Sequence, residues 1–232
     1  DADLNAARCI EVPRKTDFSL DMDAVRKAVE TYQPKILIVA SPNNPDGSLL
    51  DRKTIEELLS LPLLVVLDEA YIEFASENLS ANLSCIHEVP ARENLVVLRT
   101  FSKWAGLAGL RVGYAIAALE TIDRLNRVRA PYNVNRVGQA AALAALEDVE
   151  HSARTRAVIL EERAYLAAGL ERLGITFAPS QANFMLVRVP DSQRARENLL
   201  RGGILVRDGA AVGFPGHLRI TVGTREINDR LL

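Results

Sequence analysis

The chain of 232 residues carries 28 Lys and Arg against 30 Asp and Glu, and this near-balanced charge gives no general attraction to nucleic acid or anionic membranes. Its 48% hydrophobic content is ordinary for a globular protein of one large or two modest domains. Two distant cysteines and three histidines without metal-ligand spacing argue against a disulfide scaffold and a metal site, and no apolar run reaches membrane-spanning length.

Short apolar runs alternate with helical patterns in the first half of the chain. We expect buried strands at residues 35–40, 63–67, 95–98 and 112–117. A turn-forming segment, Ser41–Gly47, ends the first strand, and Asp51 caps a helix whose Ile55 and Leu58 share one face. This alternation predicts an α/β fold with a mostly parallel sheet, which binds ligands beyond the carboxyl ends of its strands.

The pattern changes after residue 117. Helices are predicted at 119–129, 138–146, 151–173 and 192–200, and strands at 184–189, 204–207 and 218–222. Helices interspersed with short strands in this order indicate a smaller α+β domain. We therefore divide the chain into a large domain at 1–135, incomplete at its N-terminus, and a small C-terminal domain at 136–232.

A group of polar side chains follows the third predicted strand. Lys103 offers an amine on the loop after this strand, and Thr100, Ser102 and Arg111 offer hydroxyl and guanidinium donors suited to a phosphate dianion. An isolated Ser-Lys pair would be an ordinary surface loop. An amine beside phosphate donors, however, meets two demands of pyridoxal 5'-phosphate (PLP), which attaches to proteins through an imine.

Asp68 follows the second predicted strand directly. A carboxylate at that edge of a sheet is partly desolvated and needs a cationic partner, and the protonated pyridine nitrogen of PLP is one. A helix cap or a salt-bridged aspartate is the alternative. Tyr71 and Asn44 could reach the phenolic oxygen of PLP, although Tyr71 also suits a packed aromatic ring and Asn44 a turn. In this order and at strand ends, these residues predict a PLP enzyme.

Four segments carry a resemblance to a known family: Ser41–Gly47, Val66–Phe74, Thr100–Tyr114 and Leu218–Gly223. They resemble the signature blocks of fold-type-I PLP-dependent aminotransferases, and among these most of all the histidinol-phosphate aminotransferases. The similarity runs from about Phe18 to the last residue. The block around Lys103 is specific for the superfamily and less specific for the substrate.

The resemblance implies a fold-type-I large domain and a role for each polar residue. Lys103 would hold PLP and move the proton between substrate and cofactor, while Asp68 would pair with the pyridine nitrogen. The other implied contacts are those to the phenolic oxygen, from Tyr71 and Asn44, and those to the phosphate, from Thr100, Ser102 and Arg111.

Three arginines of the second half are implied in substrate binding. Arg219 matches the anion-binding arginine of the family, whose planar fork fits the carboxylate of glutamate or 2-oxoglutarate, or the phosphate of histidinol phosphate. Arg207 and Arg230 fall where the family places further phosphate-contacting arginines, and a strand-end and a helix-surface arginine are equal alternatives. The implied reaction is transamination of L-histidinol phosphate with 2-oxoglutarate in histidine biosynthesis.

Other interpretations stay open at this point. An aromatic amino-acid aminotransferase and a threonine-phosphate decarboxylase of the same fold would differ mainly around Arg207, Arg219 and Arg230. The family has a longer N-terminal region, with a glycine-containing loop and an aromatic ring for the cofactor. We find no counterpart of these here, so a non-catalytic fragment is a third alternative. Asp46 stands where Thr is more usual.

The resemblance also implies the partners and the compartment. We expect a homodimer with its sites at the subunit interface, small-molecule substrates, and neither nucleic-acid nor membrane partners. The cytoplasm is the expected location. A plastid stroma is the alternative, because Asn43–Gly47 and Leu61–Asp68 also resemble plant-type enzymes.

Overall fold

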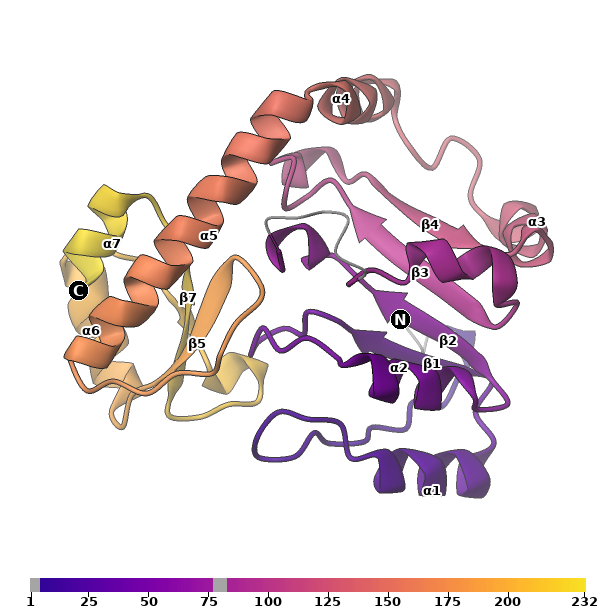
Figure 1. The fold of residues 1–232 in the computed structure, drawn as a ribbon, viewed down its shortest axis with the longest axis horizontal. Helices are drawn as coiled ribbons and strands as arrows, with labels where there is room; N and C mark the ends of the chain where they lie inside the picture. Colours follow the sequence, from indigo (N-terminus) through magenta and orange to yellow (C-terminus); the bar gives the residue numbers. More distant parts are fainter. Residues whose placement is uncertain (1–4, 77–82) are drawn as a thin grey trace.

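The computed structural model describes residues 5–76 and 83–232, which form two β-sheets flanked by a long helix, α5 (Val149–Arg172) (Figure 1). The strands of sheet A, in spatial order, are β1 (Ile36–Ala40), β2 (Leu64–Asp68), β3 (Leu95–Thr100) and β4 (Gly113–Ala117). β1, β2 and β3 are parallel, and β4 is antiparallel to β3. The predicted α/β fold with a mostly parallel sheet is confirmed.

One face of sheet A carries a large hydrophobic core. Val39, Leu67 and Val97 point into this core from three neighbouring strands. Two helices, α1 (Met22–Tyr32) and α2 (Arg52–Leu59), contribute their buried side chains to it. Apolar side chains recur on one side of each helix, so both lie against the sheet with their polar sides toward solvent.

The other face of sheet A is more open. Ile38 of β1 is 73% exposed on this face. Because side chains alternate along a strand, Ala40 points to the same side, and the strand register adds Asp68 and Thr100. The polar residues at the carboxyl ends of β2 and β3 therefore stand on the face away from the core.

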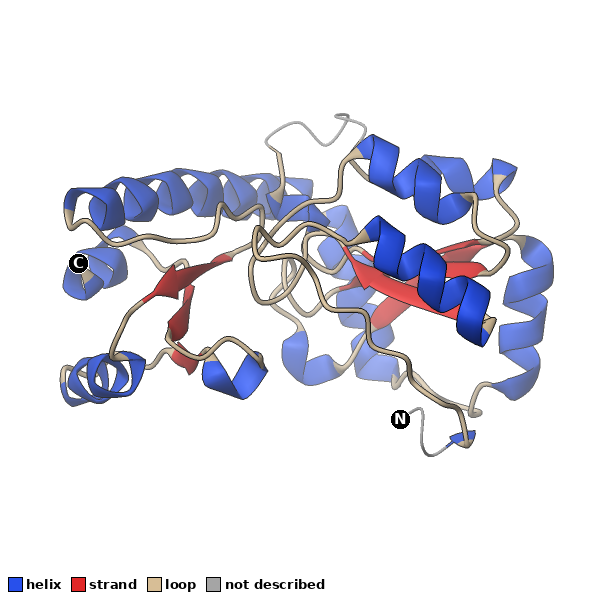
Figure 2. Cartoon of the chain, turned by 90° about the horizontal axis from the view of Figure 1, so that it is seen from below, coloured by secondary structure: helices blue, strands red, loops and turns tan. Residues whose placement is uncertain are grey.

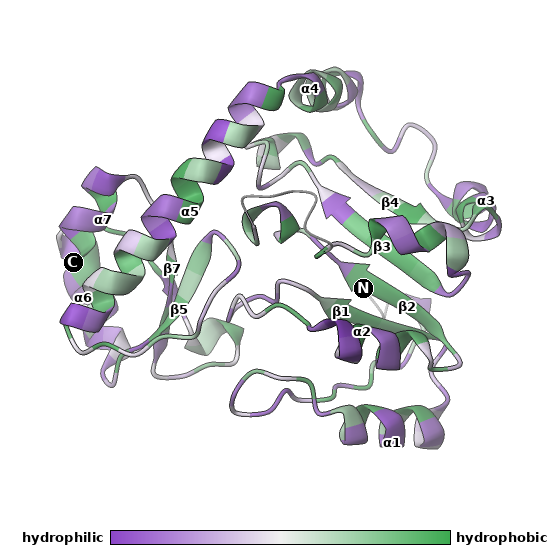
Figure 3. Ribbon diagram, in the orientation of Figure 1, coloured by the Kyte–Doolittle hydropathy of each residue, from purple (hydrophilic) through white to green (hydrophobic). Residues whose placement is uncertain are grey.

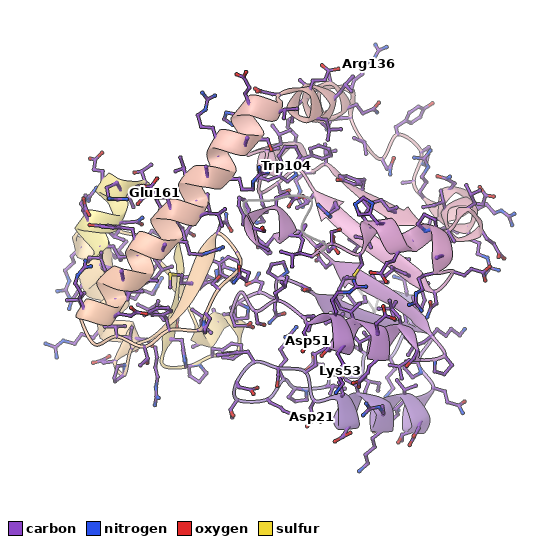
Figure 4. All side chains as sticks on the ribbon, in the orientation of Figure 1. Asp21, Asp51, Lys53, Trp104, Arg136 and Glu161 are labelled. Carbon is purple, nitrogen blue, oxygen red and sulfur yellow. The ribbon has the colours of Figure 1, made fainter. Side chains whose placement is uncertain are left out.

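Both helices on the core face begin at an aspartate. Asp21 and Asp51 each accept a backbone N–H of the first helical turn, at 3.1 Å and 2.6 Å (Figure 4). Such N-caps satisfy donors that have no partner within the helix. We predicted α2 from Asp51 but missed α1, although Val25 and Val29 beyond Asp21 carry the same signal.

Sheet B is small and antiparallel, and it forms a second core. Its strands, in spatial order, are β5 (Phe184–Arg188), β7 (His217–Thr221) and β6 (Arg207–Asp208). Leu166 of α5 is fully buried against Met185 and Leu218 of this sheet. The remaining helices around sheet B are α6 (Ser192–Arg201) and α7 (Arg225–Leu231).

The strand predicted at 204–207 is wrong in its bounds, because β6 spans only Arg207–Asp208. The backbone N–H of Ile204 donates to the carbonyl of Leu199 at 2.8 Å and so closes the end of α6. Gly203 has a φ of +77°, a left-handed conformation that lets the chain turn there. A backbone group engaged in ending a helix cannot pair in the sheet.

The remaining elements are α3 (Leu119–Val128), α4 (Arg136–Glu147) and the 3₁₀ turns η2 (Ile72–Phe74), η3 (Ile86–Ala91), η4 (Ala108–Leu110) and η5 (Ala210–Val212). They lie between strands of one sheet or, for α3 and α4, between sheet A and α5. Ala142 of α4 packs with Phe101 and Val112, beside sheet A. The division at 135/136 stays a prediction, and this packing favours a boundary after α4. Seen from below, the two sheets lie apart with loops between them (Figure 2).

None of the helices in the described part of the chain is long and apolar enough to cross a membrane. Within the same residues, no group of His, Cys, Asp and Glu side chains has the arrangement of a metal site.

Candidate active site

A cavity of about 420 Å³ lies at the carboxyl ends of β1, β2 and β3. Its lining includes the backbone and side chains around Ala40, Pro42 and Leu98. All seven predicted cofactor-binding residues also line it: Asn44, Asp68, Tyr71, Thr100, Ser102, Lys103 and Arg111. Figure 3 shows that the strands of sheet A are mainly hydrophobic and that β3 becomes hydrophilic at its tip. The tertiary structure thus brings these residues together, and the role of each stays a prediction.

Asp68 is held at the edge of this cavity by its own turn. Its Oδ1 accepts the backbone N–H of Ala70 at 3.0 Å, and its carbonyl accepts the N–H of Ser41 at 2.9 Å. Its Oδ2 makes no hydrogen bond to another described residue. The hydrogen bond to Oδ1 therefore fixes the orientation of the side chain. Because no described residue donates to Oδ2, this oxygen can accept a hydrogen bond from a ligand.

Lys103 is exposed on the loop that follows β3. Its Nζ lies 5.5 Å from the centroid of the Tyr71 ring, a cation–π distance, and makes no hydrogen bond to the described part of the chain. Tyr71 is buried and meets Phe184 edge to face, with 5.0 Å between ring centroids. The amine is consequently positioned by an aromatic wall and has no hydrogen-bonding partner that would restrain it from reaching a ligand.

The loop from Thr100 to Arg111 presents donors on the far side of the cavity. Thr100 Oγ1 accepts the backbone N–H of Ser102 at 3.0 Å, which forms a tight turn directly after β3. Arg111 adopts a left-handed conformation with φ of +56°, and its Nη1 donates to the carbonyl of Ala108 at 3.1 Å. The Thr100 hydroxyl donates to the carbonyl of Val112 at 3.4 Å, so within the described structure the Ser102 hydroxyl and the Arg111 guanidinium are the groups with spare donors for a phosphate.

Arg219 of sheet B contacts one of the residues that line this cavity. Its Nη1 donates to Asn44 Oδ1 at 2.7 Å, and its guanidinium carbon lies 5.1 Å from the centroid of the Phe184 ring. Its Nε is buried without a hydrogen-bond partner in the described structure. Because Asn44 lines the cavity, the guanidinium of Arg219 stands at its rim, with donor capacity that no described residue uses.

Arg207 lies beside Arg219 on the same face of sheet B. The two residues are register partners across β6 and β7, so their side chains emerge from the same side. Arg207 is exposed and forms neither a hydrogen bond nor an ion pair with any residue that the structure describes. Two like charges placed opposite each other repel, and an anion between them would remove this cost.

Arg230 is not brought to this site. It lies on α7, and its Nη2 donates to the carbonyl of Gly202 at 3.0 Å, where α6 ends. A cation at the carboxyl end of a helix satisfies a carbonyl that has no partner within that helix. The position of Arg230 thus favours the helix-surface alternative over substrate binding.

Phe184 and Arg163 were missed by the sequence analysis. Phe184 contacts both Tyr71 and Arg219 and so connects sheet B to the cavity. Arg163 of α5 donates to the carbonyls of Phe74 and Ala182, both at 2.9 Å, and ties the two halves together. An aromatic residue at a strand start and an arginine in a helix have ordinary local explanations, so the sequence offered no signal for these contacts.

Comparisons with known proteins agree with this arrangement. The family model for aminotransferase class I and II matches residues 1–232. Histidinol-phosphate aminotransferase of Roseiflexus castenholzii is 46% identical over the whole chain, and the chloroplastic histidinol-phosphate aminotransferase 1 of Arabidopsis thaliana is 42% identical. The chain spans 62% and 55% of these two relatives.

A solved structure is similar in three dimensions. It is histidinol-phosphate aminotransferase from Sinorhizobium meliloti in complex with pyridoxal-5'-phosphate, with a TM-score of 0.85 and 28% identity. The alignment covers 99% of this chain and 64% of that one. The described fold is therefore that of known aminotransferase structures, over about two thirds of their length.

Proposed function

Since the chain belongs to the aminotransferase class I and II family, we propose that it forms the PLP site of an enzyme that transaminates L-histidinol phosphate with 2-oxoglutarate. One observation carries this proposal: the amine of Lys103 and the carboxylate of Asp68 line a single cavity together with a set of phosphate donors. The 40–46% identity to histidinol-phosphate aminotransferases supports the choice of substrate.

The residues of the cavity fit PLP by their chemistry. A volume of about 420 Å³ lies in the range that small ligands occupy. The cavity offers an unpaired amine from Lys103, a carboxylate oxygen without a protein partner from Asp68, and hydroxyls beside the guanidinium of Arg111. Bound PLP supplies an electron sink for the negative charge that develops at the reacting carbon of the substrate.

Two residues are proposed to act on protons and charge. Asp68 keeps the pyridine nitrogen protonated through its free oxygen, which preserves the electron-withdrawing power of the ring. Lys103 would hold the cofactor through Nζ, and the same amine would accept and return a proton at the reacting carbon of the substrate. The exposed position of Lys103 beside Tyr71 leaves its amine room to move between cofactor attachment and proton transfer.

The two arginines of sheet B are proposed to orient the substrate. Arg219 binds the carboxylate of glutamate or 2-oxoglutarate with its planar fork, or the phosphate of histidinol phosphate. Arg207, its register partner, adds a second positive charge on the same face. A phosphate dianion matches two adjacent guanidinium groups better than one carboxylate does, which favours histidinol phosphate over an aromatic amino acid.

We also propose that two copies associate, as a C2 homodimer. Tyr132 is 98% exposed between α3 and α4, and large apolar side chains of these two helices are exposed as well: Leu119, Val128, Val137 and Leu143. Exposed apolar side chains on neighbouring elements support the proposal of an interaction surface there. Light scattering tests the association, and a monomer with full activity would contradict it. For the compartment, the prediction of cytoplasm or plastid stroma stands.

Borohydride reduction followed by intact-mass measurement tests the function. We expect the protein incubated with PLP to show a visible absorption band, which borohydride bleaches while a covalent adduct forms on Lys103. The Lys103→Arg variant is the control, because it keeps the charge but cannot form the link. A wild-type protein that stays colourless with PLP and gains no mass would favour the non-catalytic fragment instead.

A further inference from the structure

A buried cluster of charged side chains lies on the core face of sheet A, directly behind the cavity. The side chains of Glu69, Arg99 and Glu73 are 1%, 12% and 14% exposed. Arg99 Nε donates to Glu69 Oε2 at 2.9 Å, and Arg99 Nη1 donates to Glu73 Oε1 at 2.6 Å. One guanidinium therefore joins two carboxylates away from water.

Both oxygens of Glu69 are engaged. Glu69 Oε1 accepts the backbone N–H of Cys85 at 2.8 Å, and Oε2 also accepts the hydroxyl of Ser84 at 2.7 Å. The Nη2 of Arg99 donates to Ser84 Oγ at 2.8 Å. A carboxylate so deeply buried requires such a complete set of hydrogen-bond partners.

Stability alone is a weak reason for this cluster. Burial raises the pKa of Glu73, against the opposing effect of the Arg99 guanidinium. The second oxygen of Glu73 has no partner in the described structure. Replacing buried ion pairs with well-packed apolar residues is often neutral or stabilising, so the cluster calls for another explanation.

The position of the cluster in the strand register offers an explanation other than stability. Glu69 directly follows Asp68, and Arg99 directly precedes Thr100. The backbone N–H of Glu69 donates to the carbonyl of Leu98 at 3.0 Å, so the chain segments that carry these residues are adjacent. Because side chains alternate between faces, the side chains of Glu69 and Arg99 lie on the core face while Asp68 and Thr100 face the cavity, which Arg99 also borders.

We propose that the Glu69–Arg99 pair is a positioning device for the cofactor, an inference that depends on the proposed function. The pair ties the carboxyl end of β2 to that of β3 and so sets the spacing between Asp68 and Thr100. The ring nitrogen and the phosphate of PLP are a fixed distance apart, so a site that holds both at once depends on this spacing. A misplacement of about 1 Å can cost as much as about 100-fold in function.

The test compares two buried glutamates of the same chain, each of which contacts an arginine. Glu69→Gln weakens the pair behind the cavity, and Glu162→Gln is the matched control in the small domain. The side chain of Glu162 is 7% exposed, and its Oε1 lies 2.9 Å from Arg225 Nε. Each substitution removes a charge and keeps an amide oxygen that can accept a hydrogen bond.

We expect both variants to lower the melting temperature of the PLP-free protein, because each removes the charge of a buried glutamate that an arginine contacts. Glu69→Gln alone should raise the dissociation constant for PLP, by about tenfold. It should also reduce the visible circular dichroism per bound PLP, which reports how firmly the ring is oriented. Arg99→Lys keeps the positive charge but loses the planar guanidinium that bonds two carboxylates, so it should show the same pattern. This variant replaces Glu69→Gln in the test if Glu69→Gln does not fold.

Wild-type PLP affinity and circular dichroism in a folded Glu69→Gln or Arg99→Lys variant would overturn the proposal. Equal losses of affinity in Glu69→Gln and Glu162→Gln would overturn it too, since the pair would then act only through overall stability. If the wild-type protein forms no borohydride adduct on Lys103, the proposed function fails instead, and the two failures are thus distinguishable.

Discussion

Sheet A and sheet B contribute different chemistry to the same cavity. The carboxyl ends of the parallel strands in sheet A lead to an amine, a carboxylate and donors suited to a phosphate, whereas antiparallel sheet B places the guanidinium of Arg219 against Asn44, which lines the cavity. Parallel strands all end at one edge, so three loops can each place a polar group there. An antiparallel sheet instead offers a face, on which register partners such as Arg207 and Arg219 stand together.

Under the proposed function, this difference assigns the reaction to sheet A and substrate recognition to sheet B. Changes at the edge of sheet A should then lower kcat, and changes on the face of sheet B should raise KM. Five substitutions test this division.

The largest effect is expected for Lys103→Ala in the sheet A site. Loss of the attaching amine and of the proton-transferring atom should lower kcat by at least about 10⁴-fold. Single-turnover kinetics measures this. Lys53→Ala, on the exposed side of α2 (Figure 4), should leave kcat unchanged. Comparable activity in the two variants would mean that Lys103 is not the catalytic lysine.

Asp68→Asn should give the next largest effect. The amide oxygen can still accept the N–H of Ala70, so the turn persists, but an amide does not keep the ring nitrogen protonated. We expect kcat to fall by about 10²- to 10³-fold, as when one preorganised electrostatic group is removed. Steady-state kinetics at saturating PLP checks this. Asp23→Asn, whose side chain is 95% exposed, is the control, and an equal response in both would contradict the role of Asp68.

On the face of sheet B, Arg219→Lys should act on binding. Losing the planar fork should raise the KM for the anionic substrate about 10- to 100-fold, with a smaller change in kcat. Arg201→Lys, at a side chain that is 74% exposed, should leave both constants unchanged. A fall in kcat as large as that of Asp68→Asn would contradict the assignment of the reaction to sheet A and of substrate binding to sheet B.

Arg207→Lys refines the same experiment. Histidinol phosphate should lose more affinity than phenylalanine, because a second guanidinium serves a phosphate dianion that phenylalanine lacks. Equal increases in KM for both substrates would undermine histidinol phosphate as the substrate and favour an aromatic amino-acid aminotransferase.

The smallest effect on kcat is expected for Gly47→Ala. Gly47 lies where the sheet A half of the chain meets Ser180 of the sheet B half. Its φ is +79°, and an added Cβ would lie 2.1 Å from Ser180 Oγ. Gly174 has a similar φ of +68° with open space around it, so Gly174→Ala reports the conformational cost alone, about 1 kcal/mol. Gly47→Ala should lower the free energy of unfolding by about 1–2 kcal/mol more, because of the clash. Urea unfolding measures the free energy of unfolding of both variants. Equal decreases would show that the structure between Gly47 and Ser180 accommodates an added methyl group without a clash.

Much of the site could be predicted because its residues directly follow strands. An apolar run that ends in a polar residue is visible locally, and parallel pairing then brings Asp68 and Thr100 to one edge. The error in β6 and the position of Arg230 arose differently. In each case a contact with the end of α6 decided the outcome, and no local pattern reveals that contact.

The sequence by itself determined the α/β order of the first half, the strand ends and the identity of the chemical groups, because these depend on periodicity and on neighbours along the chain. Only the tertiary structure decided that Arg219 meets Asn44, that Phe184 joins Tyr71 to Arg219, and that Glu69 and Arg99 pair behind the cavity. The reason is physical. These contacts join residues 30 to 175 positions apart, and strand pairing within a sheet or packing between the two sheets sets which of them touch.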